Sequence, residues 1–283
     1  MVDIQITYQC NNNCLSCIIP EKAYCKEKVE KDDVIRLLDD ENPEIIAIGG
    51  GEPSIDPDFF DILRFAAEKN PEAVIKILSN GRYFFYEESV KKLLKVIKGN
   101  DNKFEVHISI YGTEKVHEKI TRSKNSFKQT LKGIKNLLDS GIEVNLRIIV
   151  NRQNYRNLNE LSDMIVEDLD NINKIIFIFS RYMGKAQKNI EEVSVKYDES
   201  VEYVQEAIDI LQKGFKGVIR LYHFPTCVLD PEYRSLVHGM TKESGGVTFL
   251  DICSECIFKN DCSGIWESYI ERFGDKEFEP LNP

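Results

Sequence analysis

Three cysteines within eight residues constrain this chain more than any other feature. Cys10, Cys14 and Cys17 stand in a short polar loop directly after residues 4–8, whose alternating apolar side chains predict a β-strand. Thiolates are soft ligands that favour iron–sulfur clusters, zinc or copper(I). A loop of this length can turn three sulfur atoms toward one metal cluster. A cubane 4Fe–4S cluster with three cysteine ligands keeps one iron open for another ligand.

Composition is that of a globular chain without a disulfide framework. The 283 residues, 42% of them hydrophobic and 30% charged, allow one large barrel domain or two ordinary domains. The eight cysteines fall into two groups separated by a long middle section without cysteine, which points to metal binding or catalysis. A formal charge of -10 argues against unassisted binding of nucleic acid.

We expect a cytoplasmic protein with no membrane partner. Met1-Val2-Asp3 leads directly into the first predicted strand, without the charged, apolar and cleavage regions of a signal peptide. The sequence has no run of about 18 apolar residues, the length that a membrane-spanning helix needs.

Apolar runs that predict strands alternate with helical patterns along the first two thirds of the chain. The predicted strands cover residues 4–8, 45–48, 74–78, 104–110, 143–150 and 174–180. The predicted helices cover residues 30–40, 59–67, 87–98, 126–138 and a segment that contains Leu158 and Leu161. Strands about 30 residues apart with helices between them predict an α/β fold with a parallel sheet. We interpret it as a partial (β/α)6 TIM barrel with a lateral opening.

The composition changes after a further predicted helix at about 198–213. Gly214 and Gly217 follow this helix, and we place a domain boundary there. Residues 1–214 are predicted to form the partial barrel, and residues 215–283 a small cysteine-rich C-terminal domain.

Glycine and polar side chains follow three of the predicted strands, at the end where barrel enzymes carry their active sites. Gly49-Gly50-Gly51-Glu52-Pro53 follows the second strand, Ser79-Asn80-Gly81 the third, and Ser109 ends the fourth, with Arg122 further on. Glycine lets the backbone approach a ligand closely. The alternatives are a glycine turn with a solvated Glu52, a plain Asn-Gly turn and a surface ion pair for Arg122. Cys25 stands apart from the other cysteines, and we expect it to be a part-buried or exposed thiol.

The second cysteine group supplies four thiols. Cys227 precedes Cys253, Cys256 and Cys262, and four thiolates complete the ligand set of a closed iron–sulfur cluster or of a structural zinc. Disulfides are not expected in a reducing cytoplasm.

The Cys-x3-Cys-x2-Cys loop after the first strand resembles the hallmark of the radical S-adenosylmethionine (radical SAM) superfamily. The resemblance implies that Cys10, Cys14 and Cys17 are the catalytic ligands of a reducing 4Fe–4S cluster. Its open iron would take the amino and carboxylate groups of SAM. The implied SAM contacts are Gly50, Gly51, Glu52, Ser79, Asn80, Ser109 and Arg122. Ser16 departs from the family pattern, because the residue before the third cysteine is usually aromatic.

The Cys-x2-Cys-x5-Cys run near the C-terminus resembles the extension of SPASM and twitch proteins, which carry auxiliary clusters. The resemblance implies one auxiliary 4Fe–4S cluster on Cys227, Cys253, Cys256 and Cys262. Trp266 stands where a complete SPASM pattern has another cysteine, so a single, twitch-like cluster is expected. Its implied role is to accept an electron from the product radical or to bind substrate at an open iron, and four candidate thiols favour electron transfer.

The implied reaction is reductive cleavage of SAM to a 5′-deoxyadenosyl radical, which abstracts hydrogen from the substrate. We expect a ribosomally synthesised peptide as substrate, modified by a crosslink, thioether or oxidation, and an electron donor such as flavodoxin or ferredoxin. An alternative is a dehydrogenase or cyclase that acts on a sugar, nucleotide or cofactor precursor. We expect no peptide-recognition domain before the first strand, which keeps this alternative open, and basic residues at the barrel mouth would favour it. A non-enzymatic alternative is an iron–sulfur electron carrier or a zinc-stabilised binding module.

Overall fold

A parallel sheet with its strands in sequence order forms the centre of the protein. The computed structural model describes residues 1–19, 31–39, 43–100, 103–238 and 245–282. The strands of the sheet are β1 (Val2–Thr7), β2 (Ile45–Gly50), β3 (Val74–Ser79), β4 (Phe104–Ser109), β5 (Val144–Val150), β6 (Lys174–Phe179) and β7 (Val218–Tyr222). Every neighbouring pair is parallel. Parallel strands need a crossover between them, and helices provide it here.

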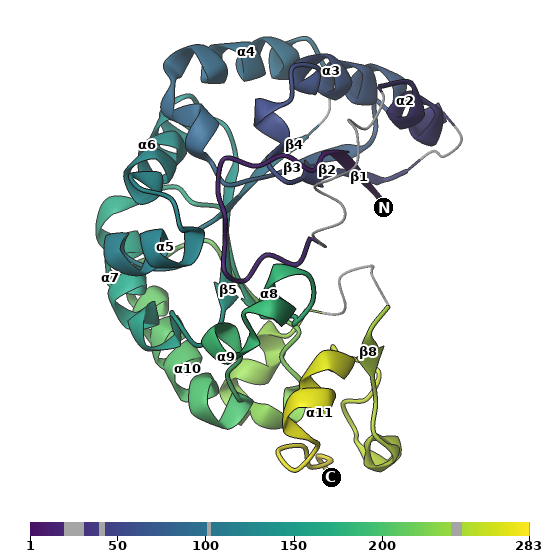
Figure 1. The fold of residues 1–283 in the computed structure, drawn as a ribbon, viewed down its shortest axis with the longest axis vertical. Coiled ribbons are helices and arrows are strands. Elements are labelled where there is room, and N and C mark those ends of the chain that lie inside the picture. The colour runs from purple at the N-terminus through teal and green to yellow at the C-terminus, as the bar shows by residue number, and fades with distance from the viewer. Residues whose placement is uncertain (20–30, 40–42, 101–102, 239–244, 283) are drawn as a thin grey trace.

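The crossover helices line the outside of an open crescent, with the strands on its inner side (Figure 1). The α-helices are α2 (Lys31–Asp39), α3 (Phe59–Lys69), α4 (Glu87–Lys98), α5 (Glu114–Thr121), α6 (Ser126–Asp139), α7 (Leu158–Asp168), α8 (Lys185–Lys188), α9 (Ile190–Val193), α10 (Tyr197–Gly214) and α11 (Glu267–Phe273). Short 3-10 helices lie at Pro53–Ile55, Arg82–Phe85, Tyr155–Asn157, Thr226–Val228, Pro231–Leu236 and Asp251–Glu255. In the described residues no pairing joins β1 to β7, so the barrel is partial, as the sequence predicts.

The two faces of the sheet have different characters because successive side chains of a strand point to opposite faces. On the outer face, Ile77, Val106 and Ile148 are fully buried in the core cluster that includes the helices. On the inner face, the alternate positions hold polar residues such as Lys76 and His107. The hydrophobic core therefore lies between sheet and helices, and the inner face is left for function.

The sheet has one strand more than the six that the sequence predicts. β7 pairs with β6 in parallel over five residues and completes a unit whose helix is α10. The sequence signal was weak because this strand is short, carries Arg220 and follows two glycines. β7 lies after residue 214 and yet belongs to the sheet of the barrel. The predicted domain boundary after residue 214 therefore remains a proposal for where the C-terminal extension begins.

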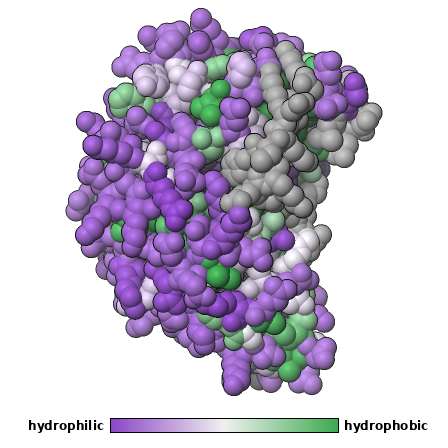
Figure 2. Space-filling model, viewed as in Figure 1, coloured by the Kyte–Doolittle hydropathy of each residue, from purple (hydrophilic) through white to green (hydrophobic). Residues whose placement is uncertain are grey.

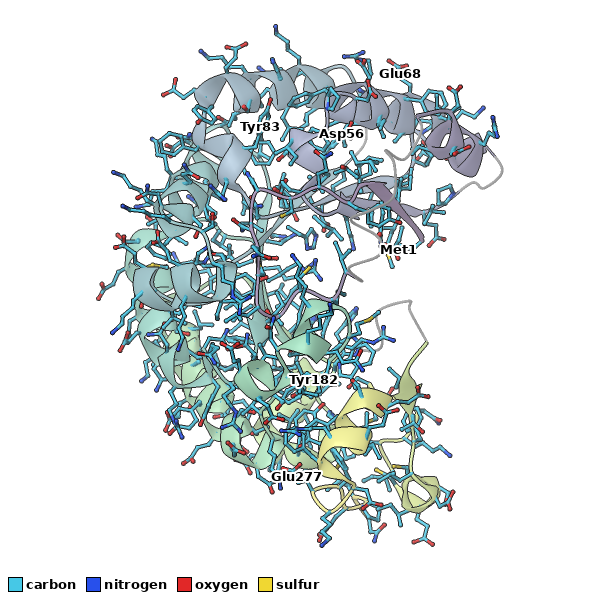
Figure 3. The ribbon with its side chains drawn as sticks, in the orientation of Figure 1. Met1, Asp56, Glu68, Tyr83, Tyr182 and Glu277 are labelled. Atoms are coloured by element: carbon cyan, nitrogen blue, oxygen red, sulfur yellow. The ribbon has the colours of Figure 1, made fainter. Side chains whose placement is uncertain are left out.

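The C-terminal extension packs on the end of β6 through aromatic rings. It contains the two-stranded antiparallel sheet of β8 (Val247–Thr248) and β9 (Ile265–Trp266), followed by α11. Tyr197 stacks on Phe179 with ring centroids 3.8 Å apart and lies 4.7 Å from the Tyr269 ring. The Tyr269 hydroxyl also donates to Glu277, which Figure 3 labels below α11. These contacts fix the extension against the barrel.

The view in Figure 2 shows a mostly hydrophilic face over the helices, with apolar patches toward the C-terminal extension. The exposed large apolar side chains of that extension include Phe249, Ile252 and Ile257. In the part of the chain that the structure describes, no helix combines the length and apolarity needed to cross a membrane.

The core between β5 and the helices gives a direct test of this architecture. Leu146 on β5 is fully buried in the core cluster, so Leu146→Ala should lower the free energy of unfolding by about 2–5 kcal/mol through lost contacts and a cavity. Urea unfolding followed by circular dichroism measures this. Lys128→Ala, at an exposed position of α6, should change stability by no more than about 0.5 kcal/mol. Equal effects of the two changes would contradict the fold.

Candidate active site

The three-cysteine loop is fastened to the C-terminal end of α5. Backbone N–H groups of Asn13 and Leu15 donate to the carbonyls of Thr121 and Ile120, at 2.9 and 2.8 Å. The last carbonyls of a helix have no partner within the helix, so the loop satisfies groups that would otherwise need water. Leu15 is buried in the core, which fixes the loop between Cys14 and Cys17.

Arg82 holds the first half of the loop. Its guanidinium donates to the carbonyl of Asn11, to Asn12 Oδ1 at 2.6 Å and to Ser123 Oγ at 2.9 Å. Gln129 Oε1 accepts from its Nε at 2.7 Å. A planar guanidinium can make several directed bonds at once, so Arg82 ties the loop to the segments after α5. Sequence reasoning missed this residue, and its only signal was its place directly after the Asn-Gly turn.

The other side of the loop contacts the segment that follows β6. Ala186 N–H donates to the Cys17 carbonyl at 3.0 Å, and Lys185 Nζ donates to Asn13 Oδ1 at 2.7 Å. Asn189 Nδ2 donates to the Leu15 carbonyl at 3.0 Å. Residues far apart in sequence therefore fix all three thiols at the C-terminal edge of the sheet.

Gly50 and Gly51 let the end of β2 approach the start of the loop. Gly51 N–H donates to the Thr7 carbonyl, and Glu52 N–H to the Gln9 carbonyl, each at 2.8 Å. A Cβ atom on Gly51 would lie 2.2 Å from the Gln9 carbonyl oxygen. Gly50 has a φ of +136° and its Cβ would lie 2.1 Å from the Thr7 carbonyl oxygen. Both positions therefore require glycine for packing, quite apart from any ligand.

Glu52 is fully buried at the end of β2. Its Oε1 accepts hydrogen bonds from the Ser54 N–H and hydroxyl and from the Ser79 hydroxyl, and its Oε2 accepts from Asn80 N–H at 2.6 Å. Burial raises the pKa of the carboxyl above its usual value, and these hydrogen bonds oppose the rise. The carboxyl group thus joins the ends of β2 and β3 and fixes two predicted site residues.

Asn80 connects this strand end to the cysteines. Its side-chain amide donates to Asn11 Oδ1 at 2.6 Å and lies 3.9 Å from Cys10 Sγ. The structure thus brings Gly50, Gly51, Glu52, Ser79 and Asn80 together beside the loop, as the strand-end reasoning predicts.

The three thiols lie close enough to influence one another's ionisation. Burial raises the pKa of Cys10 to about 11 and that of Cys14 to about 12, and the charge of Cys17 adds to both shifts. Asn12 N–H donates to Cys10 Sγ at 3.3 Å, and the Tyr111 hydroxyl hydrogen-bonds to Cys14. Buried thiolates need a compensating cation, so this donor set fits a bound iron–sulfur cluster.

Ser109 and Arg122 lie in different surroundings. Ser109 ends β4 on the inner face, opposite Arg147 of β5. Arg122 follows α5 in a left-handed conformation, and its exposed guanidinium lies 3.4 Å from Glu192 Oε1. The structure therefore places Ser109 toward the interior of the barrel, and gives Arg122 the surface ion pair that was its alternative interpretation.

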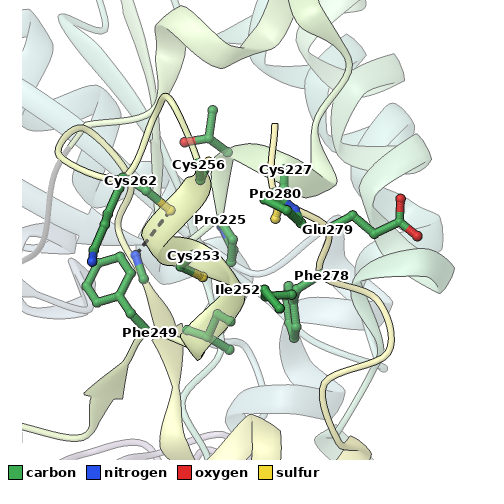
Figure 4. Close-up of a pocket in the computed structure, with 14 residues that line it drawn as sticks. Pro225, Cys227, Phe249, Ile252, Cys253, Cys256, Cys262, Phe278, Glu279 and Pro280 are labelled. Atoms are coloured by element: carbon green, nitrogen blue, oxygen red, sulfur yellow. Dashed lines mark hydrogen bonds between the residues drawn. The ribbon is translucent and has the colours of Figure 1, made fainter. Parts of the chain in front are cut away.

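The four C-terminal cysteines line one pocket in the extension, and Figure 4 shows them around it with Phe249, Ile252 and Phe278. Burial, followed by the charge of Cys262, raises the pKa of Cys227 to about 11. None of the seven described cysteines forms a disulfide, and Cys25 lies outside the described residues. In the described residues no three or more His, Cys, Asp or Glu side chains are placed to hold one single metal ion between them, whereas an iron–sulfur cluster spreads its thiolate ligands over several irons. A pocket among four thiols has the donor chemistry of a closed iron–sulfur cluster.

Comparison with protein families gives a match to the radical SAM superfamily over residues 4–165, more than half of the chain. Fe-coproporphyrin III synthase of Methanosarcina barkeri is 29% identical over 226 residues, which cover 76% of this chain and 53% of that protein. Mycofactocin maturase MftC of Mycolicibacterium smegmatis is 25% identical and covers 56% of this chain and 39% of its own length. The chain thus spans about half or less of the length of these relatives.

Two solved structures share the fold. Streptococcus suis SuiB bound to precursor peptide SuiA has a TM-score of 0.62 and 16% identity, over 78% of this chain and 48% of SuiB. AnSMEcpe with bound AdoMet and Cp18Cys peptide has a TM-score of 0.60 and 20% identity, over 77% of this chain and 62% of that one. At these identities the likeness concerns the fold alone.

The glycine run provides a test with its own control. Gly51→Ala should push the cysteine loop away, lower the free energy of unfolding by about 1–3 kcal/mol and reduce the iron bound after anaerobic reconstitution. Gly49→Ala should be tolerated because its Cβ would meet only the Leu78 side chain, at 3.4 Å. Iron per chain and urea unfolding measure the two variants. Equal iron retention and stability would show that the loop does not depend on this close approach.

Proposed function

The chain belongs to the radical SAM superfamily, and from this premise we propose that it generates a 5′-deoxyadenosyl radical and uses it to modify a peptide. Members of this superfamily use SAM and a 4Fe–4S cluster. The observation that carries the proposal is the anchored loop of Cys10, Cys14 and Cys17 at the C-terminal edge of the sheet. Three thiolates on a four-iron cluster leave one iron for SAM.

The chain's own residues prepare this place for a cluster. When bound, the cluster supplies the electron that cleaves SAM to methionine and the 5′-deoxyadenosyl radical. Cys10, Cys14 and Cys17 would hold it, and Arg82 keeps their loop in place. Asn12 and Tyr111 donate hydrogen bonds to two of the sulfur atoms, and such bonds help to set the reduction potential of a cluster.

We propose that the strand ends of β2, β3 and β4 orient SAM. In the described residues Glu52 Oε2 accepts a single hydrogen bond, and a carboxylate oxygen can accept a second. Because Glu52 is fully buried, its carboxylate would have to become accessible before it could accept this bond from the amino group of SAM. Gly50 and Gly51 would present backbone to the same group, with Ser79 and Asn80 beside it. Ser109 would contact the ribose or carboxylate of SAM. Arg122 would have to release Glu192 before it could reach SAM.

The C-terminal extension supports a second cluster in this proposal. Cys227, Cys253, Cys256 and Cys262 would ligate it fully, which suits transfer of an electron from the product radical rather than binding of substrate. A reduced flavodoxin or ferredoxin is the proposed source of the electron for SAM cleavage.

Relatives named for maturation or biosynthesis, together with a solved structure that contains a precursor peptide, support the proposal of a peptide substrate. Mycofactocin maturase MftC, sporulation killing factor maturation protein SkfB and subtilosin biosynthesis protein AlbA all match the chain at 25–26% identity. The SuiB structure contains a precursor peptide. A lateral opening in the partial barrel would let a peptide reach the inner face.

A small-molecule substrate is the second candidate, and two observations favour it. The match to Fe-coproporphyrin III synthase, a protein named for a porphyrin, covers more of the chain than the matches to MftC do. The inner face of the sheet also carries Lys76, Arg147, Lys174 and Arg220, the kind of basic cluster that suits an anionic small molecule.

Replacement of one N-terminal thiol tests the proposed radical chemistry. Cys14→Ala should abolish formation of 5′-deoxyadenosine from SAM and dithionite, to less than about 1% of the wild-type rate, because a cluster with two ligands is not held for SAM. Liquid chromatography of the anaerobic reaction measures it. Ser16→Ala should retain activity because its buried hydroxyl makes no hydrogen bond to a described residue. Continued 5′-deoxyadenosine formation by Cys14→Ala would refute the proposal.

Replacement of a C-terminal thiol tests the second cluster separately. Cys262→Ser should lower the iron content of anaerobically reconstituted protein by up to about four atoms per chain, because a closed cluster loses a ligand. Iron analysis and absorption near the sulfur-to-iron charge-transfer bands measure the loss. Ser254→Ala, at an exposed neighbouring position, is the matched control. Unchanged iron content in Cys262→Ser would exclude Cys262 as a ligand.

A further inference from the structure

The inner face of the sheet carries a concentration of positive charge in a chain whose formal charge is -10. Register places Ser109, Arg147, Ile176 and Arg220 in one row across β4, β5, β6 and β7. The two arginines in this row lie two strands apart, or roughly 10 Å between Cα atoms. The same row begins at Ser109, so the arginines lie beside the proposed SAM position.

Two lysines extend the positive charge below this row. Lys76 of β3 pairs with Glu105 of β4, and Lys174 of β6 pairs with Asn145 of β5, on the same face of the sheet. Burial lowers the pKa of His238, and the charges of Arg220, Lys174 and Lys76 lower it further. Cations from three different strands therefore lie within electrostatic reach of a single side chain, in keeping with their common face of the sheet.

Arg147 is the most enclosed of these cations. Burial lowers the pKa of its guanidinium, while Tyr111, Tyr222 and Asp3 act in the opposite direction. No hydrogen bond or ion pair that joins its guanidinium to another residue occurs in the described part of the chain. Arg147 keeps part of its surface accessible, and a partly desolvated guanidinium gains from an anion that accepts two parallel hydrogen bonds.

The carboxylates on this face leave the charge unbalanced. Glu105 is occupied by His107, whose Nε2 lies 3.0 Å from Glu105 Oε2, and by Lys103 Nζ at 3.1 Å. Asp3 stands on β1, across the barrel from β5. Lys103 Nζ also lies 3.3 Å from Glu143 Oε2. The carboxylates near the four cations are therefore Glu105 and Glu143, which are both engaged, and Asp3.

Arg147 also lies close to the cysteine loop. Tyr111, whose charge acts on Arg147, hydrogen-bonds to Cys14 through its hydroxyl group. An anion held by Arg147 would thus sit on the inner side of the cluster, where a substrate must lie for the radical to reach it.

We propose that Arg147, with Arg220 beside it, forms an anion-binding site on the inner face of the barrel that holds a carboxylate of the substrate. This inference rests on the proposed function in that it assigns the ligand of the same active site. The guanidinium of Arg147 donates two hydrogen bonds to the carboxylate, and Arg220 and Lys76 contribute longer-range attraction. The carboxylate belongs either to an acidic residue of a peptide or to a free organic acid.

Calorimetric titration of the anaerobically reconstituted, SAM-bound protein tests the site. The probes are the capped peptide acetyl-Glu-Glu-Glu-amide, the neutral peptide acetyl-Gln-Gln-Gln-amide of equal size, and citrate. At low ionic strength the wild-type protein should bind an anionic probe at least about tenfold more tightly than the neutral peptide, as a charge-assisted hydrogen-bond pair would give. Arg147→Gln should reduce that ratio to near one, and Arg220→Gln should reduce it less.

The matched control is Arg64→Gln, which removes the same charge from an exposed ion pair on the outer helix α3 and should leave the ratio unchanged. Preference for the acidic peptide supports a peptide carboxylate, and preference for citrate supports a free acid. Equal binding of all probes, an equal loss in Arg64→Gln, or weaker binding of SAM itself in Arg147→Gln would overturn the site. Formation of 5′-deoxyadenosine by the wild-type protein is measured in parallel. Its absence would refute the proposed function while Arg147-dependent anion binding would still establish the site.

Discussion

A buried carboxylate between two strand ends supports the whole candidate site. Glu52 has no exposed surface, and its two oxygens accept four hydrogen bonds, two from Ser54 and two that tie the end of β2 to Ser79 and Asn80 at the end of β3. Its backbone N–H reaches Gln9, one residue before the first thiol. Because parallel strands end at the same edge, this one residue fixes the cysteine loop relative to the sheet. An unpaired carboxyl group in this place would destabilise the fold, so the hydrogen-bond network and the site depend on each other.

The outer face of the sheet contributes to the stability of the fold, and the inner face is available for function. The outer face buries branched apolar side chains against the helices and supplies the free energy of folding. The inner face carries arginines, lysines and a buried His–Glu pair, which oppose folding unless they are solvated or bind a ligand. The unfavourable contribution of these charged side chains to the free energy of folding is explained if the inner face binds an anionic substrate. Such binding also explains how an acidic chain can contain a basic interior.

Much of the fold was predictable from periodicity, because each strand on the outer face must be apolar at every second position. Helix α4 lies at residues 87–98, as predicted, and the glycines near Glu52 signalled a close backbone approach. The strand β7 was missed because five residues with an arginine carry little periodic signal. Arg82, Tyr111 and Arg147 were missed for another reason: their partners, such as Asn11 for Arg82 and Cys14 for Tyr111, lie far away in the sequence, and no local pattern encodes such a contact. Arg122 is the opposite example. Its position in the sequence motif predicted a contact with SAM, whereas in the structure its guanidinium contacts Glu192.

The central claim is that three thiols hold a cluster with one iron open to SAM. Mössbauer spectroscopy of protein reconstituted with 57Fe, recorded with and without SAM, tests it most directly. The account predicts that SAM changes the isomer shift of one iron of the N-terminal cluster and leaves its other irons and the C-terminal cluster unchanged. A spectrum in which no iron responds to SAM, with every iron in complete protein ligation, would contradict it.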